Sequence, residues 1–262
     1  MNDRLAFYGQ VIDAWLPVRA ASILIVGAEQ NDVDLFLARG FANVTLLNLQ
    51  SAPVTMPAGW KFVVGNGQTL PFADESFDAV VAHATLHHGR SPHRILLEMY
   101  RTSIKTTIFI EARDSLLMKA VERCGLTQSY ELTAVHYNGG TSGGVDDTAV
   151  PNYVYRWTER EVEKTIASYA PHCNHTFDYR YGLDLPQTPA VLMHAPLRTA
   201  FIRAIRPLSW LLGVLLPRQQ NLFAAQIQKK QGDMQLKPWL CREGNGQLSF
   251  DKEWGSRHFR QL

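Results

Sequence analysis

Cysteine is scarce in this sequence of 262 residues, and neither a long apolar run nor a basic leader is present. The three cysteines, Cys124, Cys173 and Cys241, are widely spaced and form no CxxC pair, which argues against a disulfide framework and a zinc knuckle. The most apolar stretch, Pro207 to Pro217, is much shorter than the roughly 20 residues that a membrane-spanning helix needs. No basic region followed by an apolar run stands at the N-terminus, so no signal peptide is expected. These absences predict a cytoplasmic protein.

The order of apolar segments predicts the fold class. Short, continuous apolar runs typical of buried strands occur at Ile23–Val26, Val44–Leu47, Phe62–Val64, Phe77–Ala82 and Thr106–Ile110. Between them, Val33–Ala38, which Gly40 ends, and Pro92–Arg101 have the spacing of helices. Strands that alternate with helices are joined by parallel crossovers, so the sequence predicts an α/β protein with a doubly wound, mostly parallel sheet.

The second half of the chain predicts two further strands and a capped helix. Thr158 and Glu161 form a capping box at the start of a helix. Phe177–Tyr181 and Leu222–Ile227 are predicted as a late antiparallel strand pair, separated by a helical stretch at 189–217.

Charge is divided unevenly along the chain. Residues 1–190 carry 15 Lys and Arg against 20 Asp and Glu, whereas residues 191–262 carry 11 against 4. The segment 198–218 mixes arginines with large apolar residues, which is compatible with peripheral contact with an anionic membrane, a cap over an active site or a homodimer contact. Solvated arginines are the simpler explanation of the basic surplus.

One motif gives a specific resemblance. An LPF loop, an SFD tripeptide before a strand, a following His and an ExxR helix occur in this order at Leu70, Pro71, Phe72, Ser76, Phe77, Asp78, His88, Glu98 and Arg101. This segment resembles the central region of the type 11 methyltransferases, a family of class I S-adenosylmethionine-dependent enzymes. The resemblance implies a Rossmann-like fold, S-adenosyl-L-methionine as cofactor and methyl transfer to a small-molecule or glycan-like acceptor. An NAD-type enzyme is a weaker alternative because GxGxxG is absent.

The resemblance also implies a domain division and excludes one substrate class. Residues 1–182 would form the methyltransferase core with a lid loop at about 137–151, residues 183–220 a helical insertion or cap, and residues 221–262 the closing strand and a basic C-terminal tail. Nucleic acid is not expected as a substrate, because no NPPY-like tetrapeptide follows the fourth strand and the basic surplus lies at the C-terminal end.

The cofactor site implied by the resemblance lies after four strands. Its residues are Gly27, Ala28, Glu29, Asn48, Leu49, Asn66, Gly67 and His83. The first loop departs from the family pattern, since Ile25 replaces an acidic residue and Glu29 and Asn31 replace glycines. Asn48 and Asn66 likewise stand where the family often has acidic residues. These departures motivate an alternative, a catalytically inactive binding or scaffold protein of the same fold.

The expected catalytic residues are His88, by resemblance, and Glu111 at the end of the fifth strand. The alternative for His88 is a structural role against the cofactor loop, and the alternative for Glu111 is a solvated strand end. His87 and His136 are further candidate bases, of which His87 is expected to be exposed. No carboxylate or cysteine completes a familiar metal-ligand spacing with the histidines at 83–93, so no metal site is expected.

Three other features have both a functional and a structural interpretation. Glu98 and Arg101, at i and i+3, predict a structural ion pair. Residues 137–151 are rich in Gly, Ser, Thr and Asp, which indicates a mobile lid or a surface connection. Residues 153–157 contain Tyr153, Tyr155, Arg156 and Trp157, which could line an acceptor pocket or form a hydrophobic staple before the next helix.

Overall fold

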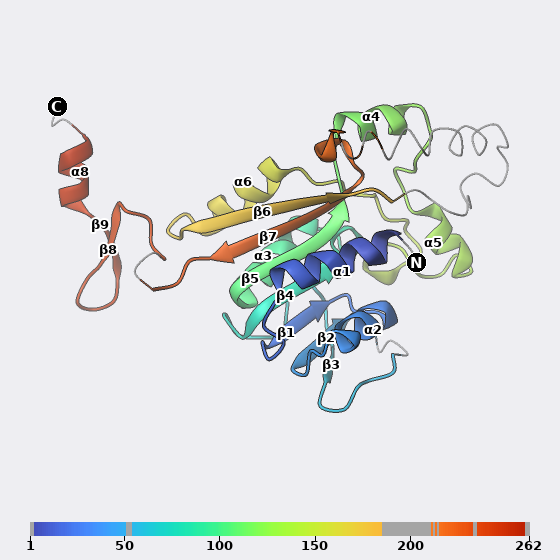
Figure 1. Ribbon diagram of the computed structural model, residues 1–262, viewed down its shortest axis with the longest axis horizontal. Coiled ribbons are helices and arrows are strands. Elements are labelled where there is room, and N and C mark those ends of the chain that lie inside the picture. Colours follow the sequence, from blue (N-terminus) through green and yellow to red (C-terminus); the bar gives the residue numbers. More distant parts are fainter. Residues whose placement is uncertain are drawn as a thin grey trace.

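A seven-stranded sheet forms the centre of the protein, in a computed structural model that describes residues 3–50, 54–184, 211, 213, 215–232 and 235–259. Its strands are β1 (Ile23–Val26), β2 (Val44–Asn48), β3 (Lys61–Val64), β4 (Phe77–His83), β5 (Ser103–Ala112), β6 (His175–Gly182) and β7 (Leu222–Lys229). They lie in the order β3-β2-β1-β4-β5-β7-β6, and β7 runs antiparallel to both of its neighbours (Figure 1). The predicted doubly wound, Rossmann-like sheet with a late antiparallel pair is therefore confirmed.

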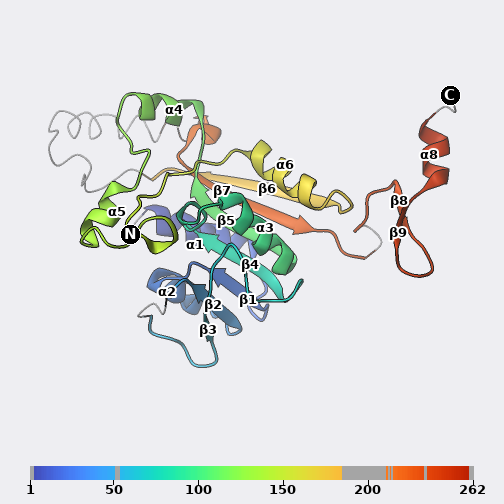
Figure 2. The same ribbon diagram turned by 180° about the vertical axis from the view of Figure 1, so that it is seen from behind.

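Helices cover both faces of the sheet, and alternate residues of each strand face opposite ways. On one face α1 (Asp3–Trp15) and α2 (Gln30–Ala38) pack on Ile23, Ile25 and their neighbours. On the other face α3 (Pro92–Thr102) and α6 (Glu159–Tyr169) pack on Leu24 and Val26. Figure 2 shows α3 and α6 in front of the strands. Two apolar layers of this kind explain why the strands read as continuous apolar runs.

Local signals fix where several elements begin and end. Thr158 accepts a hydrogen bond from the backbone of Glu161, and the Glu161 carboxylate accepts one from Thr158, as the capping box predicted. Ser91 caps α3 and is followed by Pro92 at its first turn. Gly40 ends α2 with a left-handed φ of 76°, a conformation that glycine adopts without a Cβ penalty.

The ExxR part of the motif is a structural clasp, as expected. Arg101 makes two hydrogen bonds to Glu98, at 2.8 and 3.0 Å. It also donates to the carbonyls of Leu70 and Phe72, while Glu98 accepts from the Leu70 amide. Arg101 holds the pKa of Glu98 below its usual value. Helix α3 thus anchors the LPF loop, which leads into β4.

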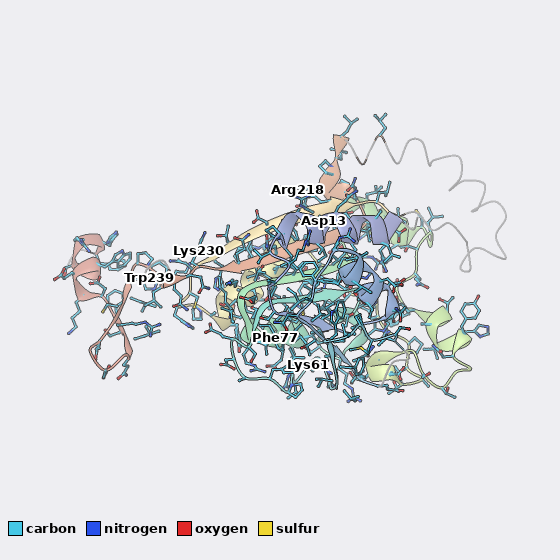
Figure 3. The ribbon with its side chains drawn as sticks, turned by 60° about the horizontal axis from the view of Figure 1, so that its bottom comes forward. Asp13, Lys61, Phe77, Arg218, Lys230 and Trp239 are labelled. Atoms are coloured by element: carbon cyan, nitrogen blue, oxygen red, sulfur yellow. The ribbon has the colours of Figure 1, made fainter. Side chains whose placement is uncertain are left out.

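Several elements were not predicted from the sequence. They are α1, α4 (Leu116–Arg123), α5 (Leu132–Tyr137) and a C-terminal unit of β8 (Leu240–Arg242), β9 (Leu248–Phe250) and α8 (Lys252–His258). Figure 3 shows Trp239 on this unit, well away from Phe77 and Lys61 of the main sheet. The interval that was expected to be a basic tail therefore contains a hairpin and a helix.

The predicted helical insertion falls almost entirely outside the described residues. Of the interval 183–220, the structure describes residues 183, 184, 211, 213 and 215–220. The last of these ranges contains the short 3-10 helix η3 (Pro217–Gln219). Within the described part of the chain, no helix is long and apolar enough to span a membrane.

Candidate functional site

A cavity of about 650 Å³ opens at the carboxyl ends of β1 to β4. Loops that follow these strands line it, together with residues of α1, the 3-10 helix η1 (Leu86–His88) and the segment 134–147. In doubly wound sheets this edge is where ligands bind, and the volume lies within the roughly 300–1,000 Å³ of small-molecule sites. Seven of the eight residues expected at the cofactor site line it: Gly27, Glu29, Asn48, Leu49, Asn66, Gly67 and His83. Ala28 is buried behind them.

The first loop requires one glycine. Gly27 has a left-handed φ of 69°, and a Cβ there would lie 2.1 Å from Cγ2 of Thr85. The amides of Gly27 and Ala28 both donate to the carbonyl of Leu47, at 2.8 and 3.0 Å. Glu29 follows in extended conformation as the N-cap of α2. The loop is therefore held by β2 and turns directly into a helix.

The residues after β2 and β3 are also tied to their own loops. Asn48 donates its amide N–H to the Ala28 carbonyl at 3.0 Å, and its amide oxygen accepts from the Leu49 amide at 2.7 Å. The amide oxygen of Asn66 accepts from the backbone of Gln68 at 2.8 Å. The Asn48 oxygen keeps a second lone pair for a ligand, whereas the Asn66 oxygen also accepts a long hydrogen bond from the Gln68 side chain at 3.5 Å.

His83 and Asp32 line one side of the cavity, and the buried Tyr8 contacts both of them. His83 stacks on Tyr8 of α1, with ring centroids 4.4 Å apart, and burial lowers the pKa of His83 to about 4. Nε2 of His83 is buried and has no hydrogen-bond partner among the described residues. Tyr8 donates to Asp32 at 2.9 Å, and burial raises the pKa of Asp32 to about 6. The neutral His83 nitrogen is therefore a polar atom that a bound ligand could satisfy.

The segment 137–151, called the lid below, lies against the mouth of the cavity. Asp146 forms an ion pair with Arg90 at 2.8 Å and accepts a hydrogen bond from Gln68 at 3.0 Å. Asp147 accepts from the side chain of Gln50 and, at 2.9 Å, from the Gly143 amide. The lid thus contacts the loops that follow β2, β3 and β4. Its mobility stays a prediction.

Glu111 is buried beneath the site and does not line the cavity. One carboxylate oxygen accepts from the Leu86 amide and the other from Nδ1 of His87, both at 2.6 Å. The charge of His87 and these hydrogen bonds outweigh burial and lower the pKa of Glu111. The expectation of a solvated strand end is wrong, because Glu111 is 1% exposed. Its position makes Glu111 an anchor for η1 and His87.

His87 is buried, contrary to the expected exposed side chain, because it inserts between two carboxylates. Glu111 lies at Nδ1, and Oε1 of Glu131 lies 3.4 Å from Nε2. Burial alone would lower the pKa of His87, but the two carboxylates raise it to about 10. The same contacts hold the pKa of Glu131 at about 2.

His88 is the predicted catalytic residue that does line the cavity. Its Nδ1 accepts from the amide nitrogen of Asn152 at 2.6 Å, and its Nε2 lies 3.5 Å from Glu131. Burial and the neighbouring charge of His87 lower the pKa of His88, so it is neutral at neutral pH. Because Nδ1 accepts from Asn152, the proton of the neutral ring lies on Nε2, and the nitrogen that could act as a general base is held by Asn152.

The aromatic segment after the lid does not form an acceptor pocket in this structure. Tyr153, Tyr155, Arg156 and Trp157 are all absent from the cavity lining, within the part of the chain that is described. Trp157 is fully buried in the same apolar cluster as Val162 of α6. This favours the hydrophobic-staple interpretation, in which the residue before the N-cap packs on the first turns of the helix. His136 is exposed on α5.

Sequence reasoning missed the residues that other elements bring to the site. Glu131 and Asn152 lie 43 and 64 positions after His88, and no spacing rule connects them. Tyr8 belongs to the unpredicted α1. Asp32 had a usable signal, since it forms a capping box with Glu29 at the start of α2.

Comparison with known proteins agrees with this geometry. Residues 26–110 match the family model described as methyltransferase domain, of type 11. No curated protein matches the chain. A chain of a Haloferax volcanii complex that contains the Trm112 methyltransferase activator is 15% identical, with 88% of this chain and 92% of that chain covered and a TM-score of 0.54.

Two further solved structures show the range of activities on this fold. Burkholderia thailandensis 1,6-didemethyltoxoflavin-N1-methyltransferase, with bound S-adenosylhomocysteine, is 14% identical over 88% of this chain and 80% of that chain, with a TM-score of 0.51. The [4+2]-cyclase SpnF is 13% identical over 87% and 81%, also with a TM-score of 0.51. The chain has the fold of the class I S-adenosylmethionine-dependent methyltransferases, and its residues 26–110 match the model of the type 11 methyltransferase domain.

Proposed function

We propose that the protein binds S-adenosyl-L-methionine in the cavity at the carboxyl ends of β1 to β4 and transfers its methyl group to a small-molecule or glycan-like acceptor. The observation that carries the proposal is the cavity itself, which seven of the eight cofactor residues implied by the family resemblance line. Gly27, Glu29, Asn66 and His83 are the residues that would hold the cofactor. Bound there, the cofactor supplies an electrophilic methyl group on a sulfonium.

The residues present fit such a ligand in polarity and charge. His83 lines the cavity, and its buried Nε2 has no hydrogen-bond partner among the described residues, so a ligand that reaches it would satisfy this atom. The cavity lining contains four carboxyl groups and one guanidinium group, that of Arg4. The carboxyl groups belong to Glu29, Asp32, Asp146 and Asp147. An acidic lining favours a ligand that carries a sulfonium and an ammonium group.

Methyl transfer needs little from the protein beyond alignment and exclusion of water. The lid lies against the mouth of the cavity, where Asp146 forms an ion pair with Arg90 and accepts a hydrogen bond from Gln68. In this position the lid can exclude water. His88 lines the cavity, so it is placed to contact the acceptor, and where the acceptor must lose a proton His88 takes it at Nδ1 once the Asn152 amide releases that nitrogen. The family signature Glu98–Arg101 acts only by fixing the loop before β4.

Calorimetric titration of the purified chain with S-adenosylmethionine and S-adenosylhomocysteine tests the proposal. We expect micromolar binding that is lost in Gly27→Arg, because a side chain at this position collides with Thr85 and fills the loop. Gly40→Arg is the matched control: its φ is also left-handed, but no atom lies within 4 Å of the added Cβ. Circular dichroism verifies that each variant is folded.

A second candidate is a binding or scaffold protein of the same fold that no longer uses the cofactor. It is favoured by the first loop, in which the amides of Gly27, Ala28 and Glu29 are all engaged within the protein. The cyclase SpnF illustrates that this fold is compatible with another activity. Absence of cofactor binding by a well-folded wild-type sample would refute methyl transfer and support this candidate.

A further inference from the structure

A cluster of metal-binding side chains lies beside the cavity. His87 and His88 of η1 and Glu131, which precedes α5, each offer one ligand atom, and these three atoms all lie within 4.8 Å of one another. Among the described residues, no other group of three such side chains meets this condition. Imidazole nitrogen together with a carboxylate oxygen is a donor set that suits zinc and related first-row divalent metals.

Two separations within the cluster, each to a different oxygen of Glu131, are longer than good hydrogen bonds and close to the distance between neighbouring ligands of one metal ion. Nε2 of His87 lies 3.4 Å from Oε1 of Glu131, and Nε2 of His88 lies 3.5 Å from Oε2. Hydrogen bonds of this type are usually ~2.7–3.2 Å long. Ligands that surround a tetrahedral zinc at about 2.0–2.1 Å are separated by roughly 3.4 Å.

The second layer around the cluster orients His87 as a ligand. Glu111 accepts from Nδ1 of His87 at 2.6 Å, which keeps the proton on that nitrogen when a metal ion displaces the proton of Nε2. Nε2 is then directed at Glu131, and it is buried without a hydrogen-bond partner among the described residues. A carboxylate behind a ligating histidine is the usual arrangement in zinc sites.

His88 can be oriented in the same way by Asn152. Oδ1 of Asn152 is buried and has no hydrogen-bond partner in the described part of the chain. The amide nitrogen of Asn152 now contacts His88 Nδ1 at 2.6 Å and Oε2 of Glu131 at 3.4 Å. Rotation of the amide by half a turn would give up both contacts and bring Oδ1 to His88 Nδ1, which would then donate to it and leave Nε2 free to bind a cation. The paired carboxylates of Glu111 and Glu131 would balance the charge of a divalent ion.

We propose that His87 Nε2, His88 Nε2 and the Glu131 carboxylate form a binding site for a divalent transition metal of the zinc type at the wall of the cavity. Of the three ligands, His88 lines the cavity, so a molecule in the cavity would approach the metal from the side of His88, and the fourth coordination position would take water or a hydroxyl or carboxylate oxygen of the acceptor. With the metal bound, His88 is a ligand and not a base, and the metal lowers the pKa of the coordinated oxygen. The role toward the acceptor rests on the proposed function, whereas the metal site itself does not.

Equilibrium dialysis of the full chain against zinc chloride, with S-adenosylmethionine absent, tests the site. We expect one zinc ion per chain, and dissociation constants at least ~10-fold higher in Glu131→Gln and His88→Gln. Glu111→Gln should weaken binding by about 10–100-fold through the second layer. His136→Gln, which alters an exposed histidine on α5, is the matched control and should bind as the wild type does.

Two further measurements make the result specific. Cobalt substitution should give the intense visible absorption of a four-coordinate ion in the wild type and not in His88→Gln. A Cys124→Ser and Cys241→Ser double variant removes exposed thiols that also bind zinc, and it should retain the site. The proposal is overturned if folded wild type binds no stoichiometric zinc, if His88→Gln and Glu131→Gln bind it unchanged, or if only the loss of the thiols abolishes binding. Cofactor titration of the same samples shows separately whether the proposed function fails.

Discussion

The buried carboxyl group of Asp32 should give the protein a distinctive dependence of stability on pH. Asp32 lies in the first turn of α2, 4% exposed, and accepts hydrogen bonds from Tyr8 and from the Glu29 amide, each at 2.9 Å. These bonds favour the ionised form, but burial and the charge of Glu29 outweigh them and raise its pKa from 3.8 to about 6. The folded protein therefore holds this proton more tightly than the unfolded chain does.

The sign and size follow from proton linkage. Below pH ~3.8 both states are protonated, and the contribution of Asp32 to stability is fully present. Between about pH 4 and 6 the unfolded chain has lost the proton and the folded protein still binds it, so the free energy of unfolding falls as the pH rises. A shift of about two units corresponds to a loss of roughly 3 kcal/mol across this interval.

Urea denaturation measures this effect in the wild type and in Asp32→Asn. The measurements should run from about pH 3.5 to about pH 7, so that they include the pKa of Asp32 in the unfolded and in the folded state. The asparagine resembles the protonated acid and cannot ionise, so the stability difference between the two proteins should change by about 3 kcal/mol across the interval, in favour of the variant at higher pH. Asp34→Asn is the control, since Asp34 is an exposed acid on the same helix. Parallel profiles for wild type and Asp32→Asn would refute the reasoning.

Three further substitutions test other parts of the structure. Arg101→Met removes charged hydrogen bonds to the LPF loop, so the free energy of unfolding measured in urea should fall by about 1.5–3 kcal/mol. Lys119→Met removes an exposed ion pair, so the same quantity should fall by less than ~1 kcal/mol. Arg90→Ala should leave global stability nearly unchanged but speed amide hydrogen exchange in the lid relative to the sheet, and unchanged exchange would contradict the lid contacts. Trp157→Ala should lower the free energy of unfolding by ~3–5 kcal/mol, because this side chain is fully buried. Tyr137→Ala, at the exposed end of α5, should change it by no more than ~0.5 kcal/mol, and similar values for the two variants would argue against a core role of Trp157.

The sheet could be predicted because each strand carries its own signal. Ile23–Val26 is apolar at every position and Phe77–Ala82 at every position except Asp78, and the structure buries Ile23–Val26 and Ala79–Ala82 between two layers of helices. The missed α1 has a weaker pattern: Tyr8, Val11 and Ile12 are fully buried, but polar and apolar residues are mixed around them. Its packing is decided by the sheet face that it covers, which no local pattern encodes.

The candidate site could be predicted only in part, for a related reason. Gly27, Asn48, Asn66 and His83 follow strands, and the carboxyl ends of parallel strands meet at one edge. Glu131 reaches the same edge from a segment without periodic pattern, so its contact with His87 exists only in the folded chain. The expectation of no metal site was based on spacing along the sequence, which could not include Glu131, and it stays a prediction against which the proposed site is to be tested.

The structure also bears on the altered cofactor loop, which was the main argument for an inactive protein. Among the residues of this loop, only Gly27 has a left-handed φ, whereas Glu29 is extended at −125° and Asn31 lies within α2. The two positions that lack the family glycines therefore carry no backbone strain, and any cost of Glu29 and Asn31 must come from the side chains themselves. Both side chains are exposed and line the cavity. The loop thus keeps its turn, and the question of activity reduces to whether these side chains contact the cofactor or exclude it, which titration of the Gly27→Arg and wild-type proteins decides.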